Sequence, residues 1–264
     1  MIINCGGKGG DSGDVAALDY SYSGTSEITG NIYGDWCITL KSAGTFIFNN
    51  LGNAAQGIEV CCVGAGGGGC SGYDNAIGGG GGEGGQVVNQ TVSVEVGTPY
   101  TISVGAGGSQ KANGGNTTGF GITATGGKGA TDIKGASGTG CGAGGRGGSV
   151  FGVNPATQES TAGGAGAYAF GDSKLRIPSF GIGYKFGAGG GGAHALNSHN
   201  CGAWSGSRAG GVSGGGDGGS YGSAGSAGTA NSGGGGGGGG NNMTYTEAGG
   251  KGGSGIVIIR NVRS

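Results

Sequence analysis

The chain has 264 residues, of which 80 are glycine and only 3 are proline, which excludes a collagen triple helix with its abundant proline. Thirteen basic residues are balanced by 14 acidic ones without a basic run, so nucleic acid is not an expected partner. Only 10% of the residues are charged and the apolar residues gather in short runs, which favours a folded chain over a disordered one.

The first 31 residues show no clear pattern, and the polar, tyrosine-containing stretch at residues 18–23 indicates an N-terminal attachment segment. Residues 35–41 then alternate apolar and polar side chains, as in a strand with one buried face. A turn leads to residues 45–48, predicted as the partner strand, and a third strand follows at residues 58–63.

The clearest predicted hairpin joins residues 86–96, in which valines alternate with polar residues, to residues 100–104 through a Gly-Thr-Pro turn. A further strand is predicted at residues 121–125. The last strand, residues 255–260, is uniformly apolar, so both of its faces must be covered. Its natural partners are the early strands, which implies that the chain leaves a β core and returns to complete it.

Glycine runs such as residues 78–82 and 233–240 cannot be α-helical, because each glycine costs about 1 kcal/mol relative to alanine. They have no side chains with which to pack as ordinary strands. The remaining regular choice is the extended threefold polyglycine II helix, whose backbone groups pair with neighbouring helices. Isolated side chains in these runs, such as Glu83, Arg146 and Asp217, are expected on the surface of the bundle.

The predicted fold is therefore mainly β, with a jelly-roll-like β-sandwich core, a bundle of polyglycine II helices, long loops and essentially no α-helix. The expected organisation is an attachment segment at residues 1–31, a β core with a first glycine-rich insert at 32–125, a polyglycine bundle with variable loops at 126–253, and a closing strand at 254–264.

Metal, cofactor and membrane sites are not expected. The seven cysteines form no Cys-x-x-Cys pair and His194 and His199 are the only histidines, so a zinc site is not predicted. The cysteines are expected to be buried and reduced, with a disulfide framework as the alternative. No apolar stretch is long enough to span a bilayer, and residues 1–5 are too short for a signal-peptide core, which predicts synthesis in the cytoplasm.

Several segments together resemble the glycine-rich domain proteins of phage and prophage tail fibres. They are residues 34–46, 60–69, 100–108 and, most specifically, the terminal residues 227–240 and 252–261. The resemblance covers about residues 32–264. It implies a β-sandwich that supports polyglycine helices, and a place in the distal part of a phage tail or fibre. The chain resembles more distantly the stand-alone distal adhesins of T-even-like phages, which alternate glycine motifs with host-determining loops.

Four segments interrupt the glycine runs and are candidates for recognition, because binding residues often lie on loops held by a rigid scaffold. They are residues 71–77, 150–162, 194–208 and 241–248. Their aromatic and hydrogen-bonding side chains suit sugars or exposed protein surfaces: Tyr73, Asp74, Phe151, His194, His199, Trp204, Arg208 and Tyr245. The alternative is that the aromatic side chains plug the ends of the bundle. Residues 167–186 are interpreted as structural.

The expected function is a non-enzymatic receptor-binding protein (adhesin) of a phage tail, located in the virion after synthesis in the host cytoplasm. Its expected partners are a bacterial cell-surface receptor, either a glycan or an outer protein, and other tail or fibre proteins, with a homotrimer as one assembly. The alternative is a purely structural virion component, such as a tail-tip cap or capsid decoration. A depolymerising enzyme is a third hypothesis, although two histidines and thinly spread carboxylates offer little for catalysis.

Overall fold

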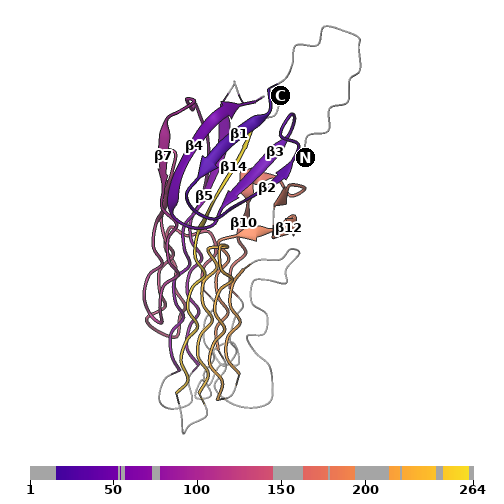
Figure 1. The fold of residues 1–264 in the computed structure, drawn as a ribbon. Coiled ribbons are helices and arrows are strands. Elements are labelled where there is room, and N and C mark those ends of the chain that lie inside the picture. Colours follow the sequence, from indigo (N-terminus) through magenta and orange to yellow (C-terminus); the bar gives the residue numbers. More distant parts are fainter. Residues whose placement is uncertain are drawn as a thin grey trace.

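The computed structural model describes residues 16–52, 54, 57–72, 78–144, 163–177, 179–193, 214–220, 222–241 and 246–261. The fold is mainly β and is built from several antiparallel sheets, as predicted. Within the described residues the helical content is one 3-10 turn, η1 (Ala169–Gly171), and no helix has the length and apolar character needed to cross a membrane. Figure 1 shows the larger sheets at one end of the molecule and the glycine-rich segments running away from them.

A five-stranded sheet receives the closing strand of the chain. Its order is β2 (Ser26–Gly30), β3 (Trp36–Leu40), β14 (Ile256–Asn261), β5 (Ile58–Val63) and β6 (Val87–Val92). The central strand β14 pairs antiparallel with β3 and β5, and all six of its residues are buried. The prediction that the last strand returns to early strands and is covered on both faces is confirmed.

One face of this sheet contributes to a core shared with a three-stranded sheet of order β1 (Leu18–Tyr22), β4 (Gly44–Leu51) and β7 (Pro99–Ile102). The shared core includes Leu18, Phe46, Phe48 and Ile102 from the smaller sheet and Trp36, Ile38, Leu40, Val60, Cys62, Val257 and Ile259 from the larger one. Phe120, between the short strands β8 (Thr117–Gly119) and β9 (Ile122–Ala124), packs against Phe46. Two sheets thus share one core, and the jelly-roll-like connectivity stays a prediction.

The other face of the five-stranded sheet is covered by residues 167–186. This segment contains β10 (Ala167–Tyr168), β11 (Arg176–Ile177), β12 (Gly181–Ile182) and β13 (Lys185–Phe186). Its side chains form a second core with the sheet, which includes Leu175, Ile177, Tyr184 and Phe186 together with Cys37, Cys61, Val63, Ile256 and Ile258. The structural interpretation of this segment is confirmed, and it explains why β14 is apolar on both faces.

Two hairpins predicted from neighbouring runs are wrong. β3 pairs with β2 and β14, whereas β4 pairs with β1 and β7. Similarly, β6 pairs with β5 and β7 pairs with β4, so these strands belong to different sheets. A short turn can pass from one sheet to another as well as close a hairpin, and here pairing with strands distant in sequence prevails.

The segment at residues 1–31 also differs from the expected organisation, because its described part contributes two core strands. β1 pairs with β4, and β2 pairs with β3. Tyr20 stacks on Phe46 with ring centroids 5.0 Å apart, so the tyrosines that indicated a polar attachment segment pack partly against the core. Their alternation with Asp19 and Ser21 is the period of a half-buried strand.

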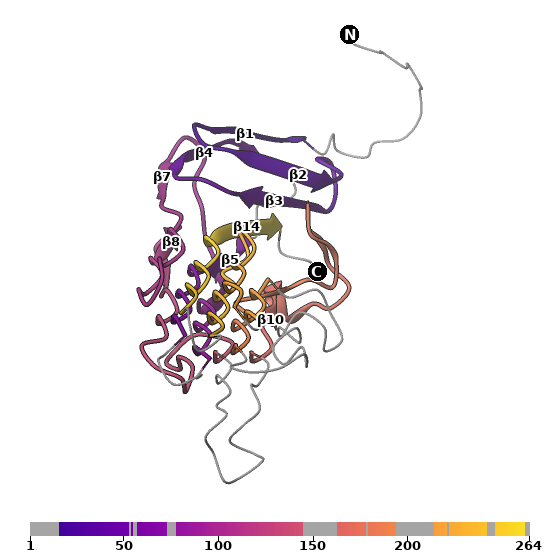
Figure 2. The same ribbon diagram turned by 90° about the horizontal axis from the view of Figure 1, so that it is seen from below.

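The glycine-rich segments form a laterally hydrogen-bonded group that we call the glycine-rich bundle, seen end on in Figure 2. Its main segments are residues 64–72, 78–85, 105–116, 126–131, 187–193, 214–220, 223–229, 233–241 and 246–255. The pairing repeats every third residue: the amides of residues 66, 69 and 72 donate to the carbonyls of residues 253, 250 and 247 at 2.9–3.1 Å. The intervening residues 67 and 70 donate to a different neighbour, at residues 83 and 80. The polyglycine II assignment stays a prediction, which this period of three supports.

Two isolated acidic side chains of the bundle lie in opposite environments. Asp217 is exposed, as predicted, whereas Glu83 has an exposed fraction of only 1%, so its expected surface position is wrong. The Glu83 carboxylate accepts hydrogen bonds from the amides of Lys128 at 2.9 Å and Gly140 at 2.8 Å. Because these amides belong to two neighbouring segments, the carboxylate is retained inside the bundle as their shared acceptor. Arg146 lies outside the described residues.

The described cysteines give a chemical test of the fold. Cys37, Cys61, Cys62 and Cys70 are buried free thiols and Cys141 is exposed, while the other two cysteines lie outside the described residues. Burial raises the pKa of the Cys62 thiol to about 12 and that of Cys61 above its ordinary range. Partial burial also raises the pKa of Cys141, although Cys141 as a residue is exposed. We therefore expect alkylation at pH 8 to modify Cys141 at least about tenfold faster than the four buried thiols, because an accessible thiolate is the reacting species.

Peptide mapping by mass spectrometry after timed alkylation measures these rates, and labelling in denaturant provides the control in which all thiols react. Modification of Cys62 at the rate of Cys141 in the native protein would contradict the expected burial.

Candidate functional site

The eight candidate recognition residues all lie outside the described residues. Tyr73 and Asp74 belong to residues 73–77, Phe151 to residues 145–162, and Tyr245 to residues 242–245. His194, His199, Trp204 and Arg208 belong to residues 194–213. The structure therefore gives the points at which these segments join the bundle, while the positions of the eight side chains stay predictions.

Three of the four segments join the same end of the bundle. We call this end the bundle tip and define it by the described residues Gly72, Gly79, Ala193, Gly240 and Glu247. It is the end away from the sheets (Figure 1). Residues 73–77 and 242–245 both leave and re-enter the bundle there, and residues 194–213 leave there.

Backbone hydrogen bonds connect these joining points directly. The amide of Gly72 donates to the carbonyl of Glu247 at 3.1 Å, and the amide of Ala193 donates to the carbonyl of Gly79 at 2.9 Å. The amide of Gly79 in turn donates to the carbonyl of Gly239 at 2.9 Å. Because the contacts are between main-chain groups, segments far apart in sequence start from closely spaced, mutually fixed positions.

The other joining points lie elsewhere on the bundle. Gly144 immediately precedes residues 145–162, and its amide donates to the carbonyl of Ala136. The amide of Ala136 in turn donates to the carbonyl of Gly81, which is two residues from Gly79. Residues 194–213 re-enter at Gly214, whose carbonyl accepts from the amide of Thr229 at 2.7 Å on the side of the sheets. Phe151 is thus in a segment that joins the flank of the bundle, and the segment of His194 and Trp204 connects its two ends.

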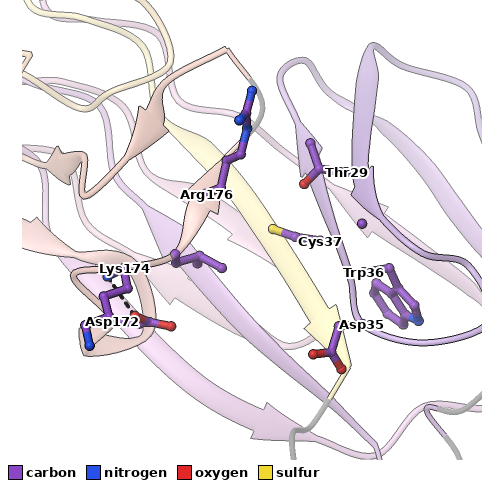
Figure 3. A pocket seen from close by; sticks show the side chains of 9 residues that line it. Thr29, Asp35, Trp36, Cys37, Asp172, Lys174 and Arg176 are labelled. Atoms are coloured by element: carbon purple, nitrogen blue, oxygen red, sulfur yellow. Dashed lines mark hydrogen bonds between the residues drawn. The ribbon is translucent and has the colours of Figure 1, made fainter.

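A second candidate site is a pocket of about 370 Å³ at the edge of the five-stranded sheet (Figure 3). Its lining residues are Thr29, Gly30, Asp35, Trp36, Cys37, Asp172, Lys174, Leu175 and Arg176. The sequence analysis missed this pocket, because it is assembled from β2, β3 and the segment that covers the second core. No local pattern brings these parts together, although the density of charged residues at 172–176 in a chain poor in charge is a weak signal.

The pocket has one charged wall, which is fixed by contacts. Asp172 accepts from the amide of Lys174 at 2.9 Å and from Arg260 at 3.3 Å. Arg260 also pairs with Glu59 at 2.5 Å and lies over the ring of Phe170, 4.3 Å from its centroid. The aromatic lining residue Trp36 is 1% exposed and packs against Phe48 in the core, so its ring is unavailable for stacking on a sugar.

Beside this pocket, Glu27 of β2 connects the sheet to the covering segment. Its carboxylate contacts Lys41 Nζ at 2.6 Å and accepts from Ser179 Oγ at 2.6 Å. The hydrogen bonds from Lys41 and Ser179 hold the pKa of Glu27 below its ordinary value. Because the folded-state pKa is lowered, the stabilisation is complete above the ordinary pKa and is lost as the pH falls through the lowered one.

We expect Glu27→Gln to reduce the free energy of unfolding by up to about 1 kcal/mol near neutral pH, because the pair is partly exposed to solvent. The difference between the two proteins should vanish as the pH falls below the lowered pKa of Glu27. Denaturant unfolding of both proteins from pH 7 to pH 3 measures it, and a difference independent of pH would contradict the role of the charge.

Within the described residues, no group of three or more His, Cys, Asp or Glu side chains is arranged to hold a metal ion. The described structure thus offers main-chain joining points at the bundle tip, which fix the ends of neighbouring segments, and a pocket with a charged wall beside the sheet. They define a mainly β scaffold protein with a glycine-rich bundle.

Comparison with known proteins places the chain in a family. The model of the glycine-rich domain matches residues 41–261, so the chain belongs to the glycine-rich domain family. The match runs from just before β4 to the end of β14 and includes the whole bundle. A search of curated proteins finds no match.

Proposed function

We propose that this protein is a receptor-binding protein of a phage tail fibre, which presents variable segments at the bundle tip to the surface of a bacterial host. The observation that carries the proposal is the meeting of three glycine-interrupting segments at one end of the bundle. Residues 73–77 and 242–245 begin and end there and residues 194–213 begin there, and these joining points, although far apart in sequence, are connected by backbone hydrogen bonds.

The composition of these segments supports binding rather than catalysis. Tyr73, Trp204 and Tyr245 offer aromatic faces with a polar group, and Asp74 and Arg208 offer hydrogen bonds to sugar hydroxyls or protein side chains. A scaffold held by main-chain hydrogen bonds tolerates changes in such segments, because few of its contacts depend on their side chains. The resemblance to tail-fibre proteins supplies the proposed location in the virion.

Binding of the labelled protein to a panel of bacterial strains tests the proposal. In three variants, residues 73–77, 194–213 or 242–245 are each replaced by a glycine-serine segment of the same length. A fourth variant replaces residues 95–98, in the exposed turn before β7 at the sheet end of the molecule, and serves as the control. We expect at least one tip variant to lose binding about tenfold or more, while the control binds as the unmodified protein does and all four unfold at similar temperatures.

Other outcomes point to the other hypotheses. Binding that survives all three tip replacements contradicts recognition at the tip. If the protein assembles into virions but binds no strain of a phage-sensitive panel, the purely structural virion component is favoured. Release of sugar fragments from cell envelopes would instead identify a depolymerising enzyme. Native mass spectrometry of the purified protein tests the expected homotrimer.

A further inference from the structure

Strand β2 presents one hydrogen-bonding edge that is not used by its sheet. In the register of β2 with β3, the amide of Lys41 donates to Thr25 at 2.8 Å and the amide of Asn31 donates to Asp35 at 2.7 Å. Main-chain groups alternate in direction along an antiparallel pair, so those of residues 27 and 29 also face β3. The amides and carbonyls of residues 26, 28 and 30 therefore point outward, and among the described residues no backbone hydrogen bond connects this edge to β11.

A continuous groove runs beside this edge. The pocket of Figure 3 and a neighbouring hollow of about 510 Å³ share Thr29 and Arg176 as lining residues. Together they follow β2 over residues 27–30, with β11 as the opposite wall. The side chain of Ile28, which lies on the opposite face of the sheet from Thr29, is 40% exposed. An added strand could thus pair with the free main-chain groups at the edge of β2. It would lie against the groove on one face of the sheet and against the exposed Ile28 on the other.

The chain itself leads to this edge. The amide of Leu18, at the start of β1, donates to the carbonyl of Ile32 at 2.9 Å, two residues beyond the end of β2. Residues 6–15 connect the described chain, which begins at Ala16, to the apolar residues 1–5. A tether of this length reaches up to roughly 33 Å when extended. Because the distance along β2 from Ile32 back to Ser26 is only about 20 Å, the tether can place residues 1–5 beside the strand.

The composition of residues 1–5, Met-Ile-Ile-Asn-Cys, suits such a strand. Ile2 and Ile3 are adjacent, so in a strand they point to opposite faces. One of them would then lie beside Ile28 and the other in the groove next to Thr29. An apolar residue is needed on each face, because each has exposed apolar surface to cover.

We propose that residues 1–5 of the same chain pair with the outer edge of β2 as a sixth strand of the five-stranded sheet. This inference is independent of receptor binding, because it concerns the end of the molecule opposite the bundle tip. Residues 1–15 lie outside the described residues, and the proposal rests on the edge, the groove and the entry point of the chain.

Hydrogen exchange of the full-length protein tests the proposal at single amides. The amides of Ile28 and Gly30 should exchange at least about tenfold more slowly in the unmodified protein than in the variant Ile3→Asp, which places a charge in the added strand. The amide of Thr29 faces β3, so its protection in both proteins confirms that the sheet itself is intact. Lys8→Gln, in the tether, is the matched control and should leave all three rates unchanged.

Two results would overturn the proposal. In the first, the amides of Ile28 and Gly30 exchange at the same rate in the unmodified protein and in Ile3→Asp. Equally fast exchange would show that nothing pairs with the edge, and equal protection would show that residues 1–5 are not the strand that pairs. In the second, protection of the two amides falls on dilution, which would identify a second copy of the chain as the source of the added strand.

Discussion

Gly236→Ala is expected to destabilise the protein by at least about 3 kcal/mol, because the bundle leaves no room for a methyl group at this position. A Cβ atom on Gly236 would lie 2.6 Å from the carbonyl carbon of Gly250 and closer still to its carbonyl oxygen. Both are main-chain atoms, so no side chain can rotate away to relieve the contact.

The substitution would also disturb the lateral hydrogen bonds. The amide of Gly236 donates to Gly67 at 2.9 Å, and the amide of Gly250 donates to Gly237 at 2.7 Å. Separating the segments enough to admit a methyl group would lengthen these bonds and those of the next residues in the period of three. Since buried main-chain groups lose water on folding, each lost bond leaves an unsatisfied donor or acceptor.

Denaturant unfolding of Gly236→Ala measures the loss, and Gly34→Ala is the matched control. Gly34 lies in the turn between β2 and β3, where the nearest atom to an added Cβ is Asn31 Nδ2 at an ordinary 3.5 Å. The control should change the free energy of unfolding by less than about 1 kcal/mol. Equal stability of the two variants would contradict the close packing of the bundle.

Glu83→Ala is expected to cost about 2–4 kcal/mol, because it removes the acceptor of two buried main-chain amides. The carboxylate bridges Lys128 and Gly140, which belong to neighbouring segments. Alanine would leave both amides without their acceptor and would leave a space where the carboxylate was. The loss is therefore greater than that of a single surface hydrogen bond.

Asp217→Ala is the control for this prediction. Asp217 is an acidic residue of the same bundle with an exposed side chain, so its removal should change the free energy of unfolding by less than about 0.5 kcal/mol. Thermal or denaturant unfolding of the two variants provides the comparison. If Glu83→Ala were as stable as Asp217→Ala, the bridging role of the carboxylate would be disproved.

Local patterns in the sequence predicted the strands better than their partners. The alternation at residues 35–41 and the uniform apolarity of residues 255–260 identified β3 and β14, and the second of these patterns also required covering on both faces. The same patterns led to two wrong hairpins, because alternation identifies a strand but does not indicate which other strands it pairs with. β1 and β2 were missed because each is only five residues long and mostly polar, so that the alternation in β1 was interpreted as a polar segment.

The need for glycine, and the exclusion of α-helix from its long runs, follow from the sequence alone, because the missing Cβ atom is a property of each residue. The neighbours of each run were decided by the tertiary structure, since a run of identical glycines contains no side-chain pattern to set its register. For the same reason the burial of Glu83 could not be predicted, nor could the closeness at the bundle tip of the joining points of residues 73–77 and 242–245 and the start of residues 194–213. Both depend on which main-chain groups pair across the bundle, and those pairs join residues far apart in the chain.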